Sequence, residues 1–250
     1  MLLLVPPSEG KSAGGAGTWV PASGSFAELG ADRLTVVGSL AAAMADPTSA
    51  AKVLGVGGRA LDQATEANRA VVGGAVLPAW QRYSGVVWAH LDPAARPGPA
   101  KRRAARSVVI VSGLLGLAAW SDPVPLYKLK MGARLPATGT LAPWWRPRLR
   151  PSLLGRAHGA VVVDLLPTEH RRAVDLADAS PRHVLDVRFL DGERNAAGHA
   201  AKAVKGMLAA HLLDCDDPVR AAATFRAPGW AAQVERESRD RTTVAIVRTG

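Results

Sequence analysis

The first segment of the chain that could carry chemistry is Pro-Pro-Ser-Glu-Gly-Lys-Ser, at positions 6–12. It follows an apolar run, Leu2–Val5, that predicts a short buried strand, and Gly-Lys-Ser after a strand is typical of a phosphate-binding loop. That loop needs a glycine six positions before the lysine, where this chain has Val5, and the two prolines remove backbone N–H donors. We therefore reject an ATPase. A tight turn at the sheet edge is one alternative; we favour a ligand site in which Glu9 and Lys11 stand at the carboxyl end of a strand.

The second segment, Tyr-Lys-Leu-Lys-Met-Gly-Ala-Arg, begins at Tyr127. Lys128, Lys130 and Arg134 stand near an aromatic ring, a combination suited to phosphate contact with base stacking. An ordinary charged surface is the alternative. Upstream, a β-branched run predicts a central strand over Val108–Ser112. The two glycines that follow this strand allow close approach of another element or of a ligand.

A third segment is the glycine-rich turn Gly55-Val56-Gly57-Gly58, which we expect between two helices within Ala50–Val72. Gly-apolar-Gly is part of the DNA-binding helix-hairpin-helix pattern, although the proline of that pattern is absent. Such a turn exposes backbone N–H groups that can hold a phosphate, and Arg59 adds charge. An ordinary helix turn with glycine caps is the alternative.

The remaining segments predict a mixed α/β fold, because strands and helices alternate. A strand is expected over Val161–Leu165, followed by a helix from Thr168, and a long helix over Ala196–Leu213 carries Lys202 and Lys205 one turn apart. Further elements expected are a helix over Phe26–Ala45, strands over Val184–Leu190 and Thr242–Arg248, and a loop over Asp92–Arg103. We expect one domain over residues 1–250, with that loop as the best candidate for a break.

Composition sets further limits. The chain has 250 residues and a formal net charge of +10. That surplus favours an anionic partner, or else belongs to a protein whose basic residues solvate the surface. The opening residues lack a signal peptide's basic and apolar regions, and no apolar run is long enough for a membrane span; we expect a soluble, cytoplasmic protein. Cys215, the one cysteine, lies among aspartates, which disfavour a reactive thiolate. We expect no metal, because the histidines lack ligand spacing, and no cofactor.

Several motifs together resemble the YaaA family of bacterial peroxide-stress proteins. The most specific is the block Val111–Leu135, with Ser-Gly-Leu, Asp-Pro and then Pro-Leu-Tyr-basic-Leu-x-Met-Gly-x-Arg-Leu. The Pro-Pro-Ser-Glu-Gly-Lys opening and the Ala201–Met207 helix segment are similar as well. Val163-Asp164-Leu165 followed by Glu169 also matches, with His170 in place of the family's usual tyrosine.

The resemblance implies a single-domain α/β fold of unusual topology with a positively charged cleft. It also implies a role in oxidative stress and in limiting damage by intracellular iron, and DNA binding through a helix-hairpin-helix element and the cleft.

Our favoured function is a DNA-binding protein of the peroxide stress response. Duplex or branched DNA is the expected partner, no membrane is involved, and no oligomeric state is predicted. The candidate DNA- or anion-binding residues are Lys11, Gly55, Gly57, Arg59, Lys128, Lys130, Arg134, Lys202 and Lys205.

The alternative is an enzyme that acts on a small anionic substrate, such as a nucleotide or base. Carboxylates repel phosphate, so a DNA-binding protein has no need of Glu9 and Glu169 there, whereas a glutamate beside lysines can act as general acid or base. Structural ion pairing with the lysines is the other explanation of these carboxylates, and we favour it over catalysis. The candidate catalytic residues are Glu9, Lys11, Tyr127, Glu169 and Lys202, with Ser112 nearby. Convergence in one narrow pocket would favour the enzyme, and lysines along an open groove would favour DNA.

Overall fold

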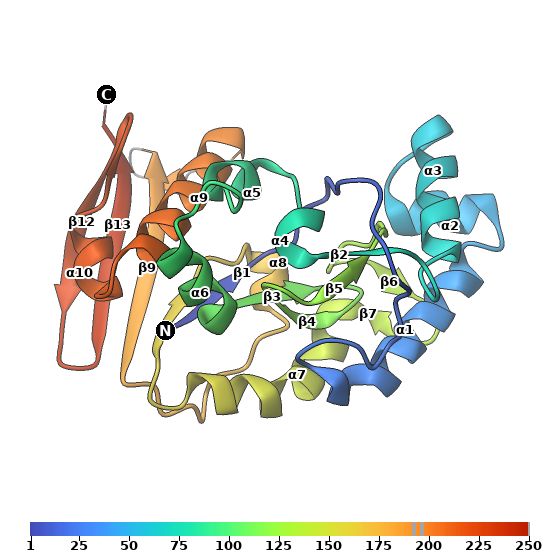
Figure 1. The fold of residues 1–250 in the computed structure, drawn as a ribbon, viewed down its shortest axis with the longest axis horizontal. Coiled ribbons are helices and arrows are strands. Elements are labelled where there is room, and N and C mark those ends of the chain that lie inside the picture. Colours follow the sequence, from blue (N-terminus) through green and yellow to red (C-terminus); the bar gives the residue numbers. More distant parts are fainter. Residues whose placement is uncertain (192–193, 196–197, 250) are drawn as a thin grey trace.

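A mixed β-sheet runs through the middle of the molecule (Figure 1), in a computed structural model that describes residues 1–191, 194–195 and 198–249. Its strands lie in the order β11 (Arg226–Ala227), β12 (Trp230–Glu237), β13 (Arg241–Arg248), β9 (His183–Asp191), β8 (Val161–Asp164), β1 (Leu2–Val5), β3 (Val108–Ser112) and β4 (Gly116–Ala119), and β10 (Arg194–Asn195) pairs with β9. Neighbours from β13 to β3 are parallel, and the pairs at both edges are antiparallel. The predicted α/β fold is confirmed.

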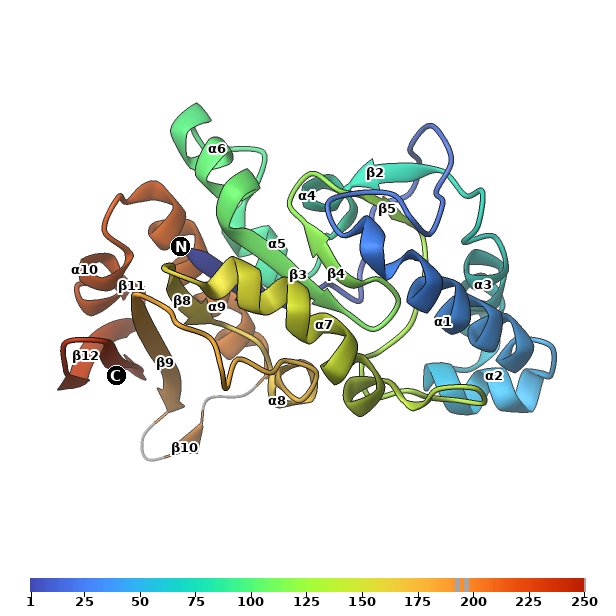
Figure 2. The same cartoon turned by 90° about the horizontal axis from the view of Figure 1, so that it is seen from below.

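The central strands are apolar because helices cover both faces of the sheet. Every residue of β1 and of β3 is buried. Figure 1 shows α5 (Val86–Leu91), α6 (Gly98–Ser107) and α9 (Gly198–Asp214) on one side of these strands, and α7 (Leu141–Ala157) on the other. Seen from below, α7 lies in front of the sheet (Figure 2). The first two residues of the predicted helix Ala196–Leu213 lie outside the described residues.

The remaining helices gather at the two ends of the molecule and beside the central strands. The 3-10 turn η1 (Ala27–Leu29), α1 (Gly30–Ala43), α2 (Pro47–Leu54) and α3 (Gly58–Arg69) form one end, and α10 (Pro218–Ala223) lies with β12 at the other (Figure 1). The short helices α4 (Ala79–Arg82) and α8 (Thr168–Arg171) lie nearer the centre. Two small ladders pair β2 (Val76–Pro78) with β5 (Pro123–Pro125) and β6 (Arg134–Leu135) with β7 (Gly139–Thr140).

The predicted loop Asp92–Arg103 is wrong in its second half, where α6 begins at Gly98. Proline is well tolerated in the first turn of a helix, where its missing N–H has no partner to lose. Pro99 stands in that first turn, and Ala100 and Ala104 bury one face of the helix. The stretch named as the best candidate for a break therefore includes the start of a helix.

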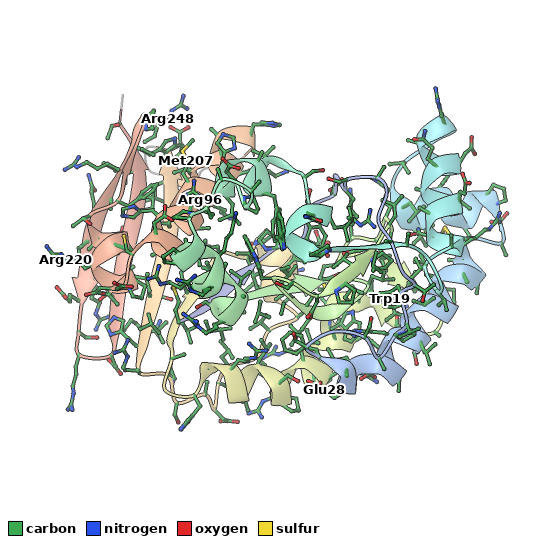
Figure 3. All side chains as sticks on the ribbon, in the orientation of Figure 1. Trp19, Glu28, Arg96, Met207, Arg220 and Arg248 are labelled. Atoms are coloured by element: carbon green, nitrogen blue, oxygen red, sulfur yellow. The ribbon has the colours of Figure 1, made fainter. Side chains whose placement is uncertain are left out.

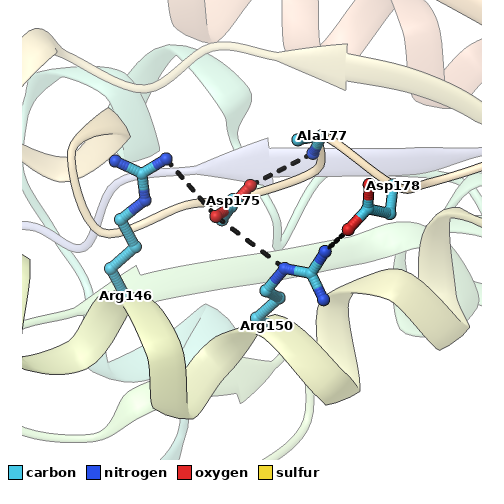
Figure 4. A network of polar contacts seen from close by, with 5 residues as sticks. All are labelled: Arg146, Arg150, Asp175, Ala177 and Asp178. Carbon is cyan, nitrogen blue, oxygen red and sulfur yellow. Dashed lines mark hydrogen bonds and ion pairs between the residues drawn. The ribbon is translucent and has the colours of Figure 1, made fainter.

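The segment after α8 is tied to α7 by ion pairs (Figure 4). Arg146 and Arg150 of α7 both reach Asp175, and Arg150 also pairs with Asp178. The backbone N–H of Ala177 lowers the pKa of the Asp175 carboxyl, and the two arginines lower it further. Arg146 and Asp178 are exposed and the other two side chains are half-buried, so the effect of these pairs is on the path of the chain more than on stability.

One buried arginine holds three separate pieces of backbone together. The guanidinium of Arg33, on α1, donates to the carbonyls of Leu115 and Leu117, both at 2.9 Å. It also donates to the carbonyls of Pro21, at 2.8 Å, and Ser23, at 2.9 Å. The N-terminal loop, α1 and the β3–β4 turn therefore depend on one side chain.

Among the described residues, none of the helices combines the length and the apolar character that crossing a bilayer requires.

We expect Arg33→Met to lower the free energy of unfolding by about 2–4 kcal/mol, because it leaves buried carbonyl groups without donors. The measurement is urea unfolding followed by tryptophan fluorescence. Arg220→Met is the matched control, because Arg220 lies exposed at the outer edge of the molecule (Figure 3) and should change stability by less than about 0.5 kcal/mol. Equal unfolding midpoints for the two variants would contradict the role given to Arg33.

Candidate functional site

The carboxyl ends of three neighbouring parallel strands lie side by side in the sheet. β1 lies between β3 and β8, so Leu4 has Val109 on one side and Asp164 on the other. The chain adds β3 on one side of β1 and later adds β8 on the other, so the strand order reverses at β1. In open α/β sheets, ligands bind in the crevice outside the carboxyl ends of the strands at such a reversal. The segment at 6–12 begins in this crevice.

The loop after β1 is held in place by α4 and the residues next to it. The backbone N–H of Ser12 donates to the Arg82 carbonyl at 2.8 Å, and Lys11 forms an isolated bridge with Tyr83. The fully buried Arg82 side chain donates to the carbonyls of Ser12 and Gly14, and to that of Val124 at 3.0 Å. Arg82 thus fixes the backbone on the carboxyl side of Lys11.

A small cavity of about 80 Å³ lies between this loop and the Tyr127–Lys130 segment. It brings together four of the five candidate catalytic residues, from three separate parts of the chain: Glu9, Lys11, Tyr127 and Glu169. The rest of the lining is Pro7, Ser8, Lys128, Leu129, Lys130 and His170. Lys202 does not line the cavity and is exposed on α9.

The amine of Lys11 lies against aromatic rings. Its Nζ donates to the Ser8 carbonyl at 2.8 Å and stands 4.1 Å from the centre of the Tyr127 ring and 5.6 Å from that of Tyr83. Burial lowers the pKa of Lys11 from 10.5 to about 7, with Lys128 and Arg82 acting in the same direction and Glu9 opposing them. The neutral form of this amine is therefore well populated near pH 7.

Behind the amine, three hydroxyl groups form a buried chain. The Tyr127 hydroxyl lies 2.8 Å from Ser112 Oγ and 3.0 Å from the Tyr83 hydroxyl. Ser112 Oγ accepts from the N–H groups of Leu114 and Leu115, both at 3.2 Å. Burial raises the pKa of both tyrosines, so both stay protonated near neutral pH. Ser112 and Tyr127 were found by sequence; Tyr83 and Arg82 belong to no motif and were missed.

The two glutamates of the site have partners. Glu9 Oε2 lies 3.8 Å from Lys128 Nζ, and Glu9 Oε1 lies 3.7 Å from Lys130 Nζ. Glu169 Oε1 accepts the backbone N–H of Gly132, where a Cβ would lie only 2.7 Å from the carboxylate. Glu9 thus has the ion pairs with lysines that the sequence left open beside catalysis, whereas the partner of Glu169 is a backbone N–H.

The glycines after β3 allow close approach of other protein elements. A Cβ on Gly116 would lie 2.7 Å from Trp145 of α7, and the φ of Gly116 is +66°. A Cβ on Gly113 would lie 3.0 Å from the Lys130 carbonyl. The second contact brings the basic segment against the end of β3.

A larger cavity of about 680 Å³ adjoins the small one, because Lys130 and Glu169 line both. We call it the groove. One wall is the end of α2, with Lys52 and Gly55, and the other is the segment from Lys130 to Gly139, with Arg134. Lys52, Lys130 and Arg134 are all exposed, and Glu169 is the carboxylate among the lining residues.

The predicted pair of helices around the glycine turn is present as α2 and α3. Gly55, with φ +64°, ends α2, and Gly57 caps α3. A Cβ on either would meet nothing within 4 Å, so backbone conformation and not crowding explains the glycine at 55. Gly55 lines the groove, whereas Gly57 and Arg59 do not line it, and Arg59 is exposed. The first of the two helices, α2, starts at Pro47, three residues before the predicted Ala50, because Asp46 caps it.

Lys205 lies elsewhere, outside both cavities. Its Nζ stands 5.2 Å from the Phe189 ring centre, and burial lowers its pKa, with Arg171 adding to the shift and Asp164 opposing it. Asp164 itself pairs with Arg171 at 2.5 Å. Lys205 thus lies near residues of β8 and β9 and not at either cavity.

Within residues 1–191, 194–195 and 198–249, no three His, Cys, Asp or Glu side chains are grouped so that they could hold a metal ion.

Comparison with known proteins decides the family. The profile described as "Peroxide stress protein YaaA" matches residues 1–233. The chain belongs to the YaaA family. Two curated relatives carry the family label UPF0246: protein SCO2297 of Streptomyces coelicolor is 34% identical over 243 residues, which are 96% of this chain and 90% of the relative. The Corynebacterium glutamicum (strain R) protein is 32% identical over 254 residues, 99% of this chain and all of the relative.

The YaaA match confirms the resemblance found in the motifs. It takes in the loop after β1, the groove and the α2–α3 turn, since all lie within residues 1–233. Both cavities are thus made of residues that belong to the family's domain.

We expect one lysine side chain of the folded protein to titrate with a midpoint near pH 7, because burial disfavours the charged Lys11 amine. Side-chain carbon shifts of isotope-labelled lysine measure this, and Lys11→Arg should remove the signal while Lys101→Arg leaves it. Lys128→Met should raise the midpoint, since it removes a cation that disfavours protonation. A protein in which every lysine titrates above pH 9 would refute the environment described for Lys11.

Proposed function

We propose that this protein binds DNA in the cytoplasm as part of the response to peroxide, and limits DNA damage linked to hydrogen peroxide and iron. The stress role is supported by the description of the family that matches residues 1–233. The DNA partner is supported by the groove, and this is the observation on which the proposal rests.

The groove suits a phosphate backbone in charge and in shape. Three cations line the groove from its two walls: Lys52, Lys130 and Arg134. A DNA strand that lies between the walls would therefore be contacted from both sides. Exposed cations neutralise phosphates and release counterions, which provides affinity without reading the base sequence. The formal charge of +10 adds a long-range attraction for any polyanion.

The α2–α3 turn adds backbone donors beside the groove. α3 has 12 residues and begins at Gly58 without a side-chain cap, so its first N–H groups are available to a phosphate oxygen. Arg59, in the first turn of α3, adds a charge to this end of the helix. In the proposed complex the turn would contact one strand of the duplex.

A second function, an enzyme on a small anionic substrate, is favoured by a different observation. Glu9, Lys11, Tyr127 and Glu169 converge on the 80 Å³ cavity, which is too small for a duplex. Charged side chains gathered around a lysine of lowered pKa are typical of a catalytic site. The two functions are compatible, because the small cavity adjoins the groove.

We expect Lys52→Ala/Arg134→Ala to weaken binding to duplex DNA of any sequence and to flatten the plot of log K against log salt by about 0.9 per lost phosphate contact. Fluorescence anisotropy with one labelled duplex and one branched DNA, from low to physiological salt, measures both effects.

The matched control is Arg220→Ala/Arg236→Ala, which removes the same charge from exposed residues of α10 and β12 at the opposite end of the molecule (Figure 1). Equal losses in both double variants would mean that net charge alone drives binding. Binding that does not change with salt would refute the proposal.

A further inference from the structure

The amine of Lys11 is unusual among the lysines of the site because it lacks a carboxylate partner. Lys128 and Lys130 both pair with Glu9. Within the described part of the chain, Lys11 Nζ forms no ion pair, and its neighbours are the Ser8 carbonyl and two tyrosine rings. A lysine in an apolar, cationic environment becomes a neutral amine and hence a nucleophile near pH 7.

The cavity around this amine has polar atoms without partners. Ser8 is only 7% exposed, and its Oγ has no hydrogen-bond partner among the described residues. The Nδ1 of His170 is buried and unpaired in the same way. Buried polar groups are almost always paired in folded proteins, so two such atoms in residues that line one cavity indicate a polar ligand there.

Size and charge restrict that ligand. A cavity of about 80 Å³ holds a group of a few heavy atoms and no base pair. At its mouth stand two lysines and one glutamate, Lys128, Lys130 and Glu9, which leave one net positive charge for a phosphate beside the group. Lys130 and Glu169 line the groove as well, so a backbone lying in the groove passes the mouth of the small cavity.

We propose that Lys11 forms an imine with an aldehyde flanked by phosphate, and that this aldehyde is the ring-opened sugar of an abasic site in DNA. A sugar without its base is the part of a DNA strand small enough for the cavity, and in its open form it carries an aldehyde carbon that a neutral amine attacks. The inference rests on the proposed binding of DNA in the groove.

The reaction needs no oxidant or reductant. The Lys11 nitrogen lone pair forms a bond to the aldehyde carbon, the carbonyl oxygen takes up protons and leaves as water, and a protonated imine remains. Removal of a proton from the adjacent carbon then breaks the C–O bond to the 3′ phosphate and forms a carbon–carbon double bond. Hydrolysis of the imine by water returns the free amine and releases the unsaturated aldehyde at the strand end.

The side chain placed to accept that carbon proton is His170. It lines the same cavity, and burial lowers the pKa of its imidazole, so the ring is neutral and able to take up a proton near pH 7. Tyr127, whose ring lies under the Lys11 amine and whose hydroxyl is held by Ser112 and Tyr83, is a positioning residue.

The experiment is reductive trapping of the full chain with sodium borohydride in the presence of a duplex containing one abasic site. We expect a covalent protein–DNA adduct, with peptide mapping placing the reduced link on Lys11 of the wild-type protein. Lys11→Arg should reduce the adduct at least tenfold, and Lys101→Arg, an exposed lysine of α6, should not change it. Mapping of the wild-type adduct keeps the test valid even if Lys11→Arg does not fold.

The pH dependence separates this amine from an ordinary lysine. Trapping should rise through about pH 7, because burial with Lys128 and Arg82 lowers the pKa of Lys11 while Glu9 opposes them. The rings of Tyr83 and Tyr127 also face the amine and stay protonated there, and the other titratable side chains that line the cavity are Lys130, Glu169 and His170. A yield that rises only above pH 9 would overturn the assignment.

Two further measurements identify the source of the aldehyde and separate this inference from the proposed function. An adduct with deoxyribose 5-phosphate but none with abasic DNA would overturn the DNA assignment in favour of a small phosphorylated aldehyde. No adduct with either, or one that maps to another lysine, would overturn the inference altogether. Fluorescence anisotropy with intact duplex, measured in parallel, tests DNA binding by the groove alone. Binding without trapping would refute only this inference. Absence of both binding and trapping would refute the proposed function as well.

Discussion

The position of β1 between β3 and β8 is the constraint on which the site depends. Because all three strands are parallel, their carboxyl ends lie at one edge, and the loop that leaves β1 emerges between the ends of the other two. Pro6 and Pro7 lack the backbone N–H groups that a further ladder strand would need, so other groups must hold the backbone of this loop. The buried Arg82 does so through carbonyl groups, and the place of Lys11 over Tyr127 follows from it.

Much of the central sheet could be predicted from the sequence, because parallel strands buried on both faces are continuous apolar runs. Leu2–Val5 and Val108–Ser112 are such runs, and their predicted bounds agree with β1 and β3. The α2–α3 turn was predictable for another reason, since Gly55 is a left-handed helix cap that few other residues fill well. Both signals are local, and neither depends on distant parts of the chain.

The features that the sequence did not predict depend on contacts between distant parts of the chain, or carry a local signal that points to another structure. In α7, Pro147 and Pro151 argue against a helix, yet both face solvent, while Trp145, Leu149 and Leu153 form a buried stripe at intervals of four. Burial of that stripe outweighs the lost backbone hydrogen bonds. Four of the five candidate catalytic residues meet in the small cavity, but Lys202 lies outside it, because α9 packs mainly against α5 and leaves Lys202 exposed. No spacing rule along one chain could have shown that Lys202 lies apart from the other four residues.

The site contains two kinds of cation, and their surroundings separate their tasks. Lys52 and Arg134 are exposed, so they attract a polyanion through water, in a way that salt screens. Lys11 lies against aromatic rings, where its charge is disfavoured, so it adds little to that attraction and gains nucleophilicity instead. Glu9 pairs with Lys128 and Lys130 at the mouth of the cavity and forms no ion pair with the inner amine, although its charge still favours the protonated form of Lys11. A carboxylate that would be out of place in a simple DNA groove therefore has a physical reason to stand there.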